Sequence, residues 1–224
     1  MKILYLETSS KNCSVAVSDN EKLLCVCEEV SENYKQSESL HTYVEWALEG
    51  AGIALKDIEA VSLGKGPGSY TGLRIGAASA KGFCYGLKVP LIAVNSLESM
   101  IEPFLGDNYD FIVPLIDARR MEVYTAVYDG NTGKELSETE AKILDETSFE
   151  EFKDKKVLFV GDGAKKAKDI LNLPDAVFNE TVYPSAKYLI TRTLEKMENK
   201  EFEDMAYFEP FYLKDFHGVK KKGS

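Results

Sequence analysis

Cysteine is scarce in this chain, which has four among 224 residues, and the pattern excludes a zinc-ribbon or disulfide framework. Cys25 and Cys27 fall on one face of a predicted strand, but no second pair follows to complete a zinc site. Cys13 and Cys84 also lie inside apolar strand or helix patterns rather than loops. We interpret all four as reduced core residues and expect a cytoplasmic protein.

Positive charge and histidine are also in short supply. The chain has 27 Lys and Arg against 37 Asp and Glu, which gives a net charge of −10 and a pI near 4.9. Because affinity for nucleic acid comes mostly from neutralising phosphates, this balance disfavours a free-standing nucleic-acid binder. The two histidines, His41 and His217, have no partner at metal-ligand spacing, so we expect structural roles for both.

Long apolar runs are missing as well. The N-terminal segment meets a charge at Glu7 after four apolar residues, too soon for the apolar region of a signal peptide. No run approaches the roughly 20 apolar residues of a membrane span. We therefore expect no membrane association.

What the chain does contain is two blocks with a similar order of elements. In the first block we predict strands at 3–6, 13–18 and 23–28, a helix from Ser37 to Gly50, a strand at 60–63, a helix at 70–87 and a strand at 91–94. In the second we predict strands at 111–116 and 123–128, a weak strand within 134–144, a short helix at 147–153, a strand at 157–160, helices at 165–171 and 185–200, and a strand at 176–178. The repeated order predicts two α/β lobes, at 1–105 and 106–224.

A glycine-rich turn joins the strand at 60–63 to the helix at 70–87 and has two readings. Gly64, Gly66 and Gly68 precede the helix start, an arrangement that suits an anion such as phosphate. Within the helix, Gly72, Gly76 and Ala80 recur every four positions and leave one helix face nearly bare, which would let another helix approach closely.

Six segments together resemble one protein family. They are Leu-Glu-Thr-Ser-Ser at 6–10, Gly-Lys-Gly-Pro-Gly-Ser-Tyr-Thr-Gly-Leu-Arg-Ile-Gly at 64–76, Val-Asn-Ser-Leu at 94–97, Ile-Asp-Ala-Arg-Arg-Met-Glu-Val-Tyr at 116–124, Gly-Asp-Gly-Ala at 161–164 and Tyr-Pro-Ser-Ala at 183–186. With the duplicated element order, they make the chain similar to the bacterial TsaB (YeaZ) family. The resemblance implies the duplicated, two-lobed actin-like ATPase superfold, which is ribonuclease H-like, with a mixed sheet and helices in each lobe.

The resemblance also implies a function. Proteins of this family are non-catalytic scaffold or activating subunits of the machinery that forms N6-threonylcarbamoyladenosine next to the anticodon of tRNAs reading codons that begin with A. The implied partners are a TsaD-like catalytic subunit and a TsaE-like ATPase, with tRNA reached only through the complex. A homodimer is an alternative for the isolated chain.

The residues agree with a subunit that has no chemistry of its own. The related catalytic subunit holds a metal with a His-x-x-x-His pair, and Ser96 and Met100 stand at the corresponding positions here. Glu7 stands where actin-like ATPases place an Asp that positions Mg-nucleotide, and its extra methylene would displace the metal. Asp162, in the second glycine turn, would repel phosphate. We expect no metal site and no cofactor of its own, with ATP or ADP at the interface of the assembled complex as an option.

The candidate nucleotide or anion contacts come from three segments. They are Thr8, Ser9, Lys65, Gly66, Gly68, Gly161 and Gly163. The alternative is that Thr8 and Ser9 only cap the first strand. Arg74, Arg119 and Arg120 could clamp phosphate or form salt bridges, and the sequence leaves that choice open.

The candidate partner interface lies on the two helices of the first lobe. We place it at Tyr43 and Trp46 of the first helix and at Gly72, Gly76 and Ala80 of the second, and lobe-one helices form the heterodimer in the family that the chain resembles. The alternative is that the small residues pack on the lobe's own sheet.

Three other functions compete with a scaffold. An active actin-like small-molecule kinase or ATPase would turn over ATP, and replacing Glu7 would abolish the turnover. A peptidase is disfavoured because both motif histidines are absent and no Ser/His/Asp or Cys/His set is present. A direct tRNA reader is disfavoured by the negative charge.

Overall fold

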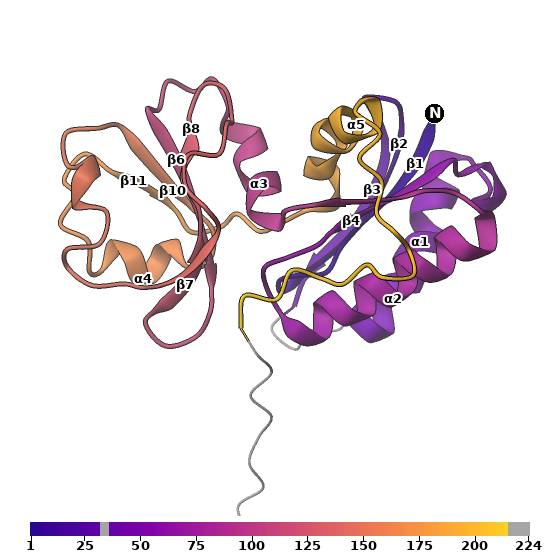
Figure 1. Cartoon of the computed structure of the whole chain (residues 1–224), viewed down its shortest axis with the longest axis horizontal. Coiled ribbons are helices and arrows are strands. Elements are labelled where there is room, and N and C mark those ends of the chain that lie inside the picture. The colour runs from indigo at the N-terminus through magenta and orange to yellow at the C-terminus, as the bar shows by residue number, and fades with distance from the viewer. Residues whose placement is uncertain (32–35, 215–224) are drawn as a thin grey trace, which may run out of the picture.

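Two mixed sheets organise the chain into two lobes (Figure 1). This computed structural model describes residues 1–31 and 36–214, without the side chains of residues 36 and 37. The predicted helix cap at Ser37 and the predicted role of His217 lie outside what it describes.

The first sheet is built as the sequence predicts. β1 (Lys2–Glu7), β2 (Asn12–Asp19) and β3 (Lys22–Val30) form an antiparallel meander, and β4 (Ala60–Gly64) and β5 (Leu91–Val94) add in parallel beside β1. The order across the sheet is β3-β2-β1-β4-β5. Because side chains alternate along a strand, β1 turns Leu4 and Leu6 to one face and Ile3 and Tyr5 to the other.

Two helices cover the Leu4 and Leu6 face. α1 (Gln36–Ala51) and α2 (Tyr70–Leu87) pack there, and a 3₁₀ turn (Leu55–Asp57) follows α1. α2 begins at a serine cap, where Ser69 Oγ accepts the Gly72 N–H at 3.4 Å, and ends at Lys88, whose φ is +59°.

The second sheet repeats the first. β6 (Phe111–Asp117), β7 (Glu122–Thr125) and β9 (Glu140–Ile143) are antiparallel, while β10 (Val157–Val160) and β11 (Val177–Asn179) run parallel to β6. Read from the other end, the order β9-β7-β6-β10-β11 matches that of the first sheet strand for strand. The predicted internal duplication is therefore confirmed.

Several elements of the second lobe are shorter than the sequence suggests. The short β8 (Tyr128–Asp129) pairs with β6, and the weak pattern within 134–144 forms a strand only at β9. The helix predicted at 147–153 is a 3₁₀ turn (Glu150–Phe152), and the one predicted at 165–171 is α4 (Ala164–Lys168). Another 3₁₀ turn (Glu102–Phe104) precedes the second sheet.

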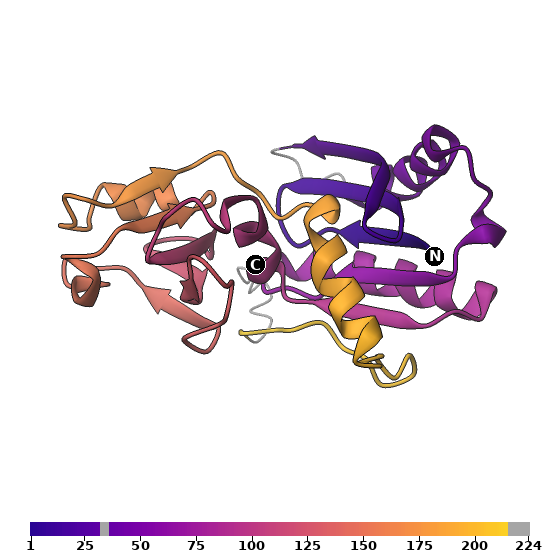
Figure 2. The ribbon, with the colours of Figure 1, turned by 90° about the horizontal axis from the view of Figure 1, so that it is seen from above.

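Each lobe receives a helix from the other half of the chain, so the predicted division at 105/106 does not describe the packing. α3 (Ser96–Ile101) buries Leu97 and Met100 against the second sheet. The 3₁₀ turn Ala186–Leu189 and α5 (Ile190–Glu198) cover the Ile3 and Tyr5 face of the first sheet, as Figure 2 shows. The sequence shows that α5 is amphipathic, but an apolar stripe does not say which sheet it covers.

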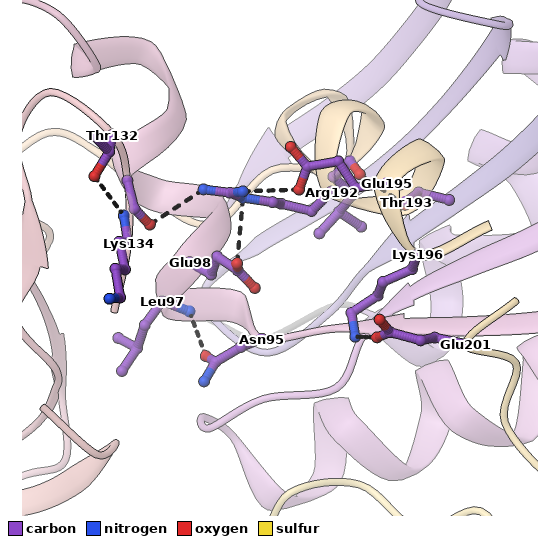
Figure 3. A network of polar contacts seen from close by, with 12 residues as sticks. Asn95, Leu97, Glu98, Thr132, Lys134, Arg192, Thr193, Glu195, Lys196 and Glu201 are labelled. Carbon is purple, nitrogen blue, oxygen red and sulfur yellow. Dashed lines mark hydrogen bonds and ion pairs between the residues drawn. The ribbon is translucent and has the colours of Figure 1, made fainter. Parts of the chain in front are cut away.

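A polar network fastens α5 to α3 and to the second lobe (Figure 3). Arg192 of α5 forms an ion pair with Glu98 of α3, with Nε 3.2 Å from Oε1, and a second with Glu195 at 2.8 Å. Its Nη2 also donates to the carbonyl of Gly133, which lies beyond β8, at 3.2 Å. One guanidinium therefore links elements of both lobes.

The segment that follows α5, residues 199–214, returns along the first lobe and is called the C-terminal strap below. Phe208 enters the first core, and the Phe211 N–H donates to the Lys65 carbonyl at 2.8 Å. The ring of Tyr212 lies 4.8 Å from that of Tyr70, and Lys214 forms an ion pair with Glu122 of β7. Within residues 1–31 and 36–214, no helix combines the length and the apolar character that crossing a bilayer requires.

Candidate functional site

The end of β1 holds a buried carboxylate where an actin-like ATPase would place its metal-binding Asp. Glu7 is fully buried, its Oε1 accepts the Ser9 N–H at 2.7 Å, and its Oε2 accepts the Ser96 hydroxyl at 2.9 Å. Burial raises the pKa of Glu7, and the hydrogen bonds from Ser9 and Ser96 oppose that rise without cancelling it. The carboxylate is thus committed to contacts within the chain.

Ser96 joins this carboxylate to the glycine turn. Besides donating to Glu7, its Oγ accepts the Gly66 N–H at 3.2 Å, and its own N–H donates to the Gly66 carbonyl at 2.9 Å. Met100, at the second position of the missing histidine pair, is also fully buried, and a side chain on Gly161 would contact its Cε. Both positions are filled by structural contacts.

The residues present do not fit a resident metal. A hydroxyl that donates to Glu7 and a buried thioether are poor substitutes for two imidazoles as ligands of a divalent cation. Among the residues that the structure describes, no group of three or more His, Cys, Asp or Glu side chains is arranged to hold a metal ion.

The first glycine turn is tight because other parts of the chain fill the space around it. A side chain on Gly64 would overlap the Glu7 carboxylate, and one on Gly68 would overlap the Ser9 carbonyl. The Lys65 N–H donates to the Val94 carbonyl at 2.8 Å, and the Ser69 N–H donates to the Ser9 carbonyl at 2.6 Å. Two N–H groups of the turn, those of Lys65 and Ser69, are thus already engaged within the chain, which weighs against the predicted anion cradle.

The other candidate anion contacts are dispersed in the same way. Thr8 is fully buried and donates its hydroxyl to the Gly72 carbonyl at 2.8 Å. Lys65 instead lines a separate cavity of about 940 Å³ between the lobes, together with Asn95, Glu98 and Lys196. The structure thus places Ser9 against Gly68 and Thr8 against Gly72, whereas Gly66 bonds to Ser96 and the side chain of Lys65 lies apart.

The second glycine turn is likewise engaged with its own sheet. Gly161 has φ +119°, and the Gly163 N–H donates to the Leu115 carbonyl at 3.0 Å. Asp162 Oδ1 accepts the Asp117 N–H at 2.8 Å. Burial raises the pKa of Asp162, and the hydrogen bond from Asp117 opposes that rise without cancelling it. The turn presents a carboxylate at the position where a phosphate loop would present free N–H groups.

The predicted bare face of α2 is not bare, and this is the main correction to the sequence analysis. A side chain on Gly72 would overlap the Thr8 carbonyl, and one on Gly76 would overlap the Thr8 hydroxyl. Ala80 is fully buried in the first core. The small residues allow α2 to lie against the end of β1 in its own lobe, so they are not available to a partner.

A second set of small residues does face outward. Ala78 is exposed, and a side chain built on Gly82 or Gly86 would meet nothing within 4 Å. Tyr85, beside them, is 78% exposed. We call Ala78, Gly82, Tyr85 and Gly86 the outer face of α2. Small residues recur every four positions on both faces of α2, at Gly72, Gly76 and Ala80 and again at Ala78, Gly82 and Gly86. The sequence analysis recognised only the first set.

On α1 the two predicted interface residues behave differently. Trp46 is 55% exposed, whereas Tyr43 is 8% exposed and donates its hydroxyl to Glu29 of β3 at 2.7 Å. The Trp46 ring lies 5.7 Å from that of Tyr43. His41 is exposed on the same helix, and its ring lies 5.9 Å from that of Phe83 of α2.

The three arginines lie on the surface in two places. Arg74 is exposed and stacks over the Tyr70 ring at 5.5 Å. Arg119 and Arg120 occupy the turn between β6 and β7 and are exposed.

Sequence reasoning missed the bond between Ser96 and Glu7 and the contact of the C-terminal strap with the glycine turn, because both join segments far apart in the chain.

Comparison with known proteins gives consistent matches. Residues 26–217 match the model of the TsaD family, described as tRNA N6-adenosine threonylcarbamoyltransferase. The chain is 32% identical over 209 residues to the tRNA threonylcarbamoyladenosine biosynthesis protein TsaB of Buchnera aphidicola from Acyrthosiphon pisum, covering 88% of this chain and 90% of that protein.

Two solved structures share the fold. YeaZ from Pseudomonas aeruginosa superposes with a TM-score of 0.83 at 25% identity, covering 95% of this chain and 99% of that one. The activator of the 2-hydroxyisocaproyl-CoA dehydratase from Clostridium difficile, solved with bound ADPNP, gives 0.51 at 11% identity, over 91% and 99% of the two chains, and shows the fold alone. These matches confirm the predicted two-lobed actin-like α/β fold. The chain therefore belongs to the TsaB (YeaZ) family of tRNA threonylcarbamoyladenosine biosynthesis proteins.

Proposed function

We propose that this chain is the non-catalytic subunit that pairs with a TsaD-like transferase and activates it, with a TsaE-like ATPase joining the pair. The observation that carries the proposal is the hydrogen bond from Ser96 to the buried Glu7. At the place where the resemblance to the catalytic subunit calls for a metal-binding histidine, this chain has a hydroxyl that completes its own core.

The chemistry of the cleft supports the same conclusion. Phosphoryl or carbamoyl transfer needs a group that stabilises developing negative charge, usually a metal ion or free N–H donors. In this chain the Glu7 carboxylate accepts hydrogen bonds from Ser9 and Ser96. N–H groups of the glycine turn donate to carbonyl and hydroxyl oxygens of the same chain. ATP or ADP would accordingly bind where the two subunits meet and not in this turn.

We assign to the transferase subunit the surface formed by Trp46 of α1 and the outer face of α2. Trp46 and Tyr85 are large and exposed, which is the composition typical of interface hot spots. Gly82 and Gly86 lie open beside Tyr85, so that a helix of a partner could approach the backbone of α2 closely. With a net charge of −10, the chain would reach tRNA through the transferase.

Reconstitution tests the proposal. The cognate TsaC-, TsaD- and TsaE-like proteins, ATP, threonine, bicarbonate and tRNA are combined with and without this chain, and N6-threonylcarbamoyladenosine is measured by mass spectrometry of the digested tRNA. We expect product only when the chain is present, and no ATP turnover by the chain alone. Equal product without the chain would refute the proposal. Turnover by the pure chain that Glu7→Ala abolishes would favour a kinase or ATPase instead.

A further inference from the structure

The C-terminal strap stays on the first lobe until its last residues. The Phe211 N–H donates to the Lys65 carbonyl at 2.8 Å, and the ring of Tyr212 lies 4.8 Å from that of Tyr70 at the start of α2. Figure 1 shows the strap running along α2 and ending between the two lobes. Lys214 contacts the second lobe, so the strap crosses from one lobe to the other between Tyr212 and Lys214.

Lys214 makes two contacts on one face of β7. Its ammonium forms an ion pair with the Glu122 carboxylate and lies 5.6 Å from the centre of the Tyr124 ring. Glu122 and Tyr124 are alternate residues of the strand, so their side chains point to the same face and receive Lys214 together. The side chains of Lys214 and Glu122 are 33% and 24% exposed, so water screens this pair only in part. We call the two contacts of Lys214 the clasp.

The space between the strap and the second lobe is lined mostly by acidic side chains. It is the cavity of about 940 Å³ described above, and four carboxylates of its lining have no ion-pair partner among the described residues. Two come from the segment 135–139 of the second lobe and two from the strap: Glu135, Glu138, Glu203 and Glu209. Of the two lysines in the lining, Lys196 is paired with Glu201, which leaves Lys65 to offset these charges. Because like charges repel, the two walls favour a wider separation of the strap from the second lobe.

A second polar link joins the lobes at a different edge of this cavity. Arg192 of α5 pairs with Glu98 of α3 and donates to the Gly133 carbonyl of the second lobe (Figure 3). Glu98 lines the cavity, as Phe211 of the strap does, so the cavity lies between the Arg192 network and the strap. Since α3 leads into the second sheet and α5 follows it, both passages of the chain between the lobes adjoin this network. Two chain passages on one side and a non-covalent clasp on the other are the parts of a hinge and a latch.

We propose that the clasp is a releasable latch that holds the two lobes in the arrangement described here. While Lys214 is bound to Glu122 and Tyr124, the strap closes one side of the cavity. When the clasp opens, repulsion between the acidic walls moves the second lobe away from the strap, which stays on the first lobe, and the lobes turn about the Arg192 network. The latch governs access to the cavity and does not depend on the pairing proposed above.

Distances between the lobes test the latch in the full chain. A ketone-bearing amino acid replaces Glu49 of α1 and Lys155 of the second lobe, both exposed, and carries spin labels that leave the native cysteines untouched. Double electron–electron resonance then gives the distribution of distances between the two labels. We expect a narrow distribution for the native chain, and a longer distance in about half or more of the Lys214→Gln molecules, in which the ammonium of the clasp is absent.

Further variants separate the latch from the loss of any surface charge. Exchanging both charges, Lys214→Glu with Glu122→Lys, should restore the native distribution. Lys168→Gln breaks an ion pair with Glu180 inside the second lobe and should leave the distribution unchanged. Adding Glu135→Gln and Glu138→Gln to Lys214→Gln should shorten the distance again, because the walls then repel each other less.

Hydrogen–deuterium exchange distinguishes opening of the lobes from fraying of the strap. If the strap stays on the first lobe, the Phe211 N–H keeps its bond to Lys65, and its exchange in Lys214→Gln should match that of the native chain. Circular dichroism checks that each variant is folded. Faster exchange at Phe211 would mean that the strap leaves the first lobe, and an unchanged distance would mean that the clasp does not hold the lobes. Either result overturns the proposal, as does an exchanged charge pair that fails to restore the native distances.

Discussion

The inner and outer faces of α2 carry the same kind of residue and have opposite surroundings. On the inner face, Gly72 and Gly76 leave no room for a methyl group because Thr8 occupies the space. On the outer face, a methyl group on Gly82 or Gly86 would meet open space. A stripe of small residues therefore reports that something approaches closely, or could approach closely. Only the structure tells whether that neighbour belongs to the same chain or to a partner protein.

The largest expected effect comes from adding one methyl group to the inner face. Gly72→Ala would place a carbon on the Thr8 carbonyl oxygen, a backbone atom that cannot move without displacing the end of β1. We expect a loss of about 3 kcal/mol in the free energy of unfolding, at the upper end for overpacked sites. Urea titration followed by circular dichroism measures it. A variant as stable as the native chain would show that the two faces do not differ in packing.

Removing one hydroxyl on the inner side should have the next largest effect. Ser96→Ala removes the hydrogen bonds that Glu7 Oε2 and the Gly66 N–H make with the Ser96 hydroxyl in a buried site. An unsatisfied buried group costs about 1–3 kcal/mol, and we expect a loss in that range. Ser79→Ala, on α2, is the control and should change stability by less than about 0.5 kcal/mol. Similar values for the two variants would argue against a structural role for Ser96.

The fold was predictable because each signal was local and periodic. The strands, α1, α2 and the duplicated order follow from alternation and helical spacing, and the structure confirms them. The crossing of α3 and α5 between lobes was not predictable, since amphipathicity does not name the sheet that a helix covers. The contacts of the site were still harder to predict from the sequence. The positions of Ser96 and Met100 were noticed, but the bond from Ser96 to Glu7 spans 89 residues and leaves no local signature.

The outer face can be tested without disturbing the fold. Gly82→Arg adds a long charged side chain in open space, so stability should change by less than about 1 kcal/mol. If the transferase subunit packs against this face, its affinity should fall about tenfold or more, as measured by isothermal titration calorimetry. Thr191→Arg, exposed on α5, is the matched control and should bind normally. Undiminished pairing by Gly82→Arg would place the interface elsewhere.

A pH titration separates the inner side from the rest of the molecule. Because burial raises the pKa of Glu7 above its usual 4.5, the folded chain keeps a proton that the unfolded chain releases. Unfolding then releases a proton, so Glu7 makes the free energy of unfolding fall as pH rises from 4.5 to the raised pKa. The free energy of unfolding of Glu7→Gln should fall less steeply over that pH range, as measured by urea titrations at successive pH values. Parallel curves for the two chains would mean that Glu7 is ionised at its usual pH.

The smallest expected effect has the opposite sign to the first and completes the comparison. Gly82→Ala adds the same methyl group as Gly72→Ala, in the same helix, but at a position where it contacts nothing. Alanine restricts the unfolded chain more than glycine, so the variant should be about 0.5–1 kcal/mol more stable than the native chain. The native sequence forgoes this gain at Gly82 and again at Gly86. If the outer face receives a helix of the transferase, Gly82→Ala should raise the midpoint of urea unfolding and weaken the pairing at once. A gain in stability with unchanged affinity would mean that the glycines of the outer face serve no partner.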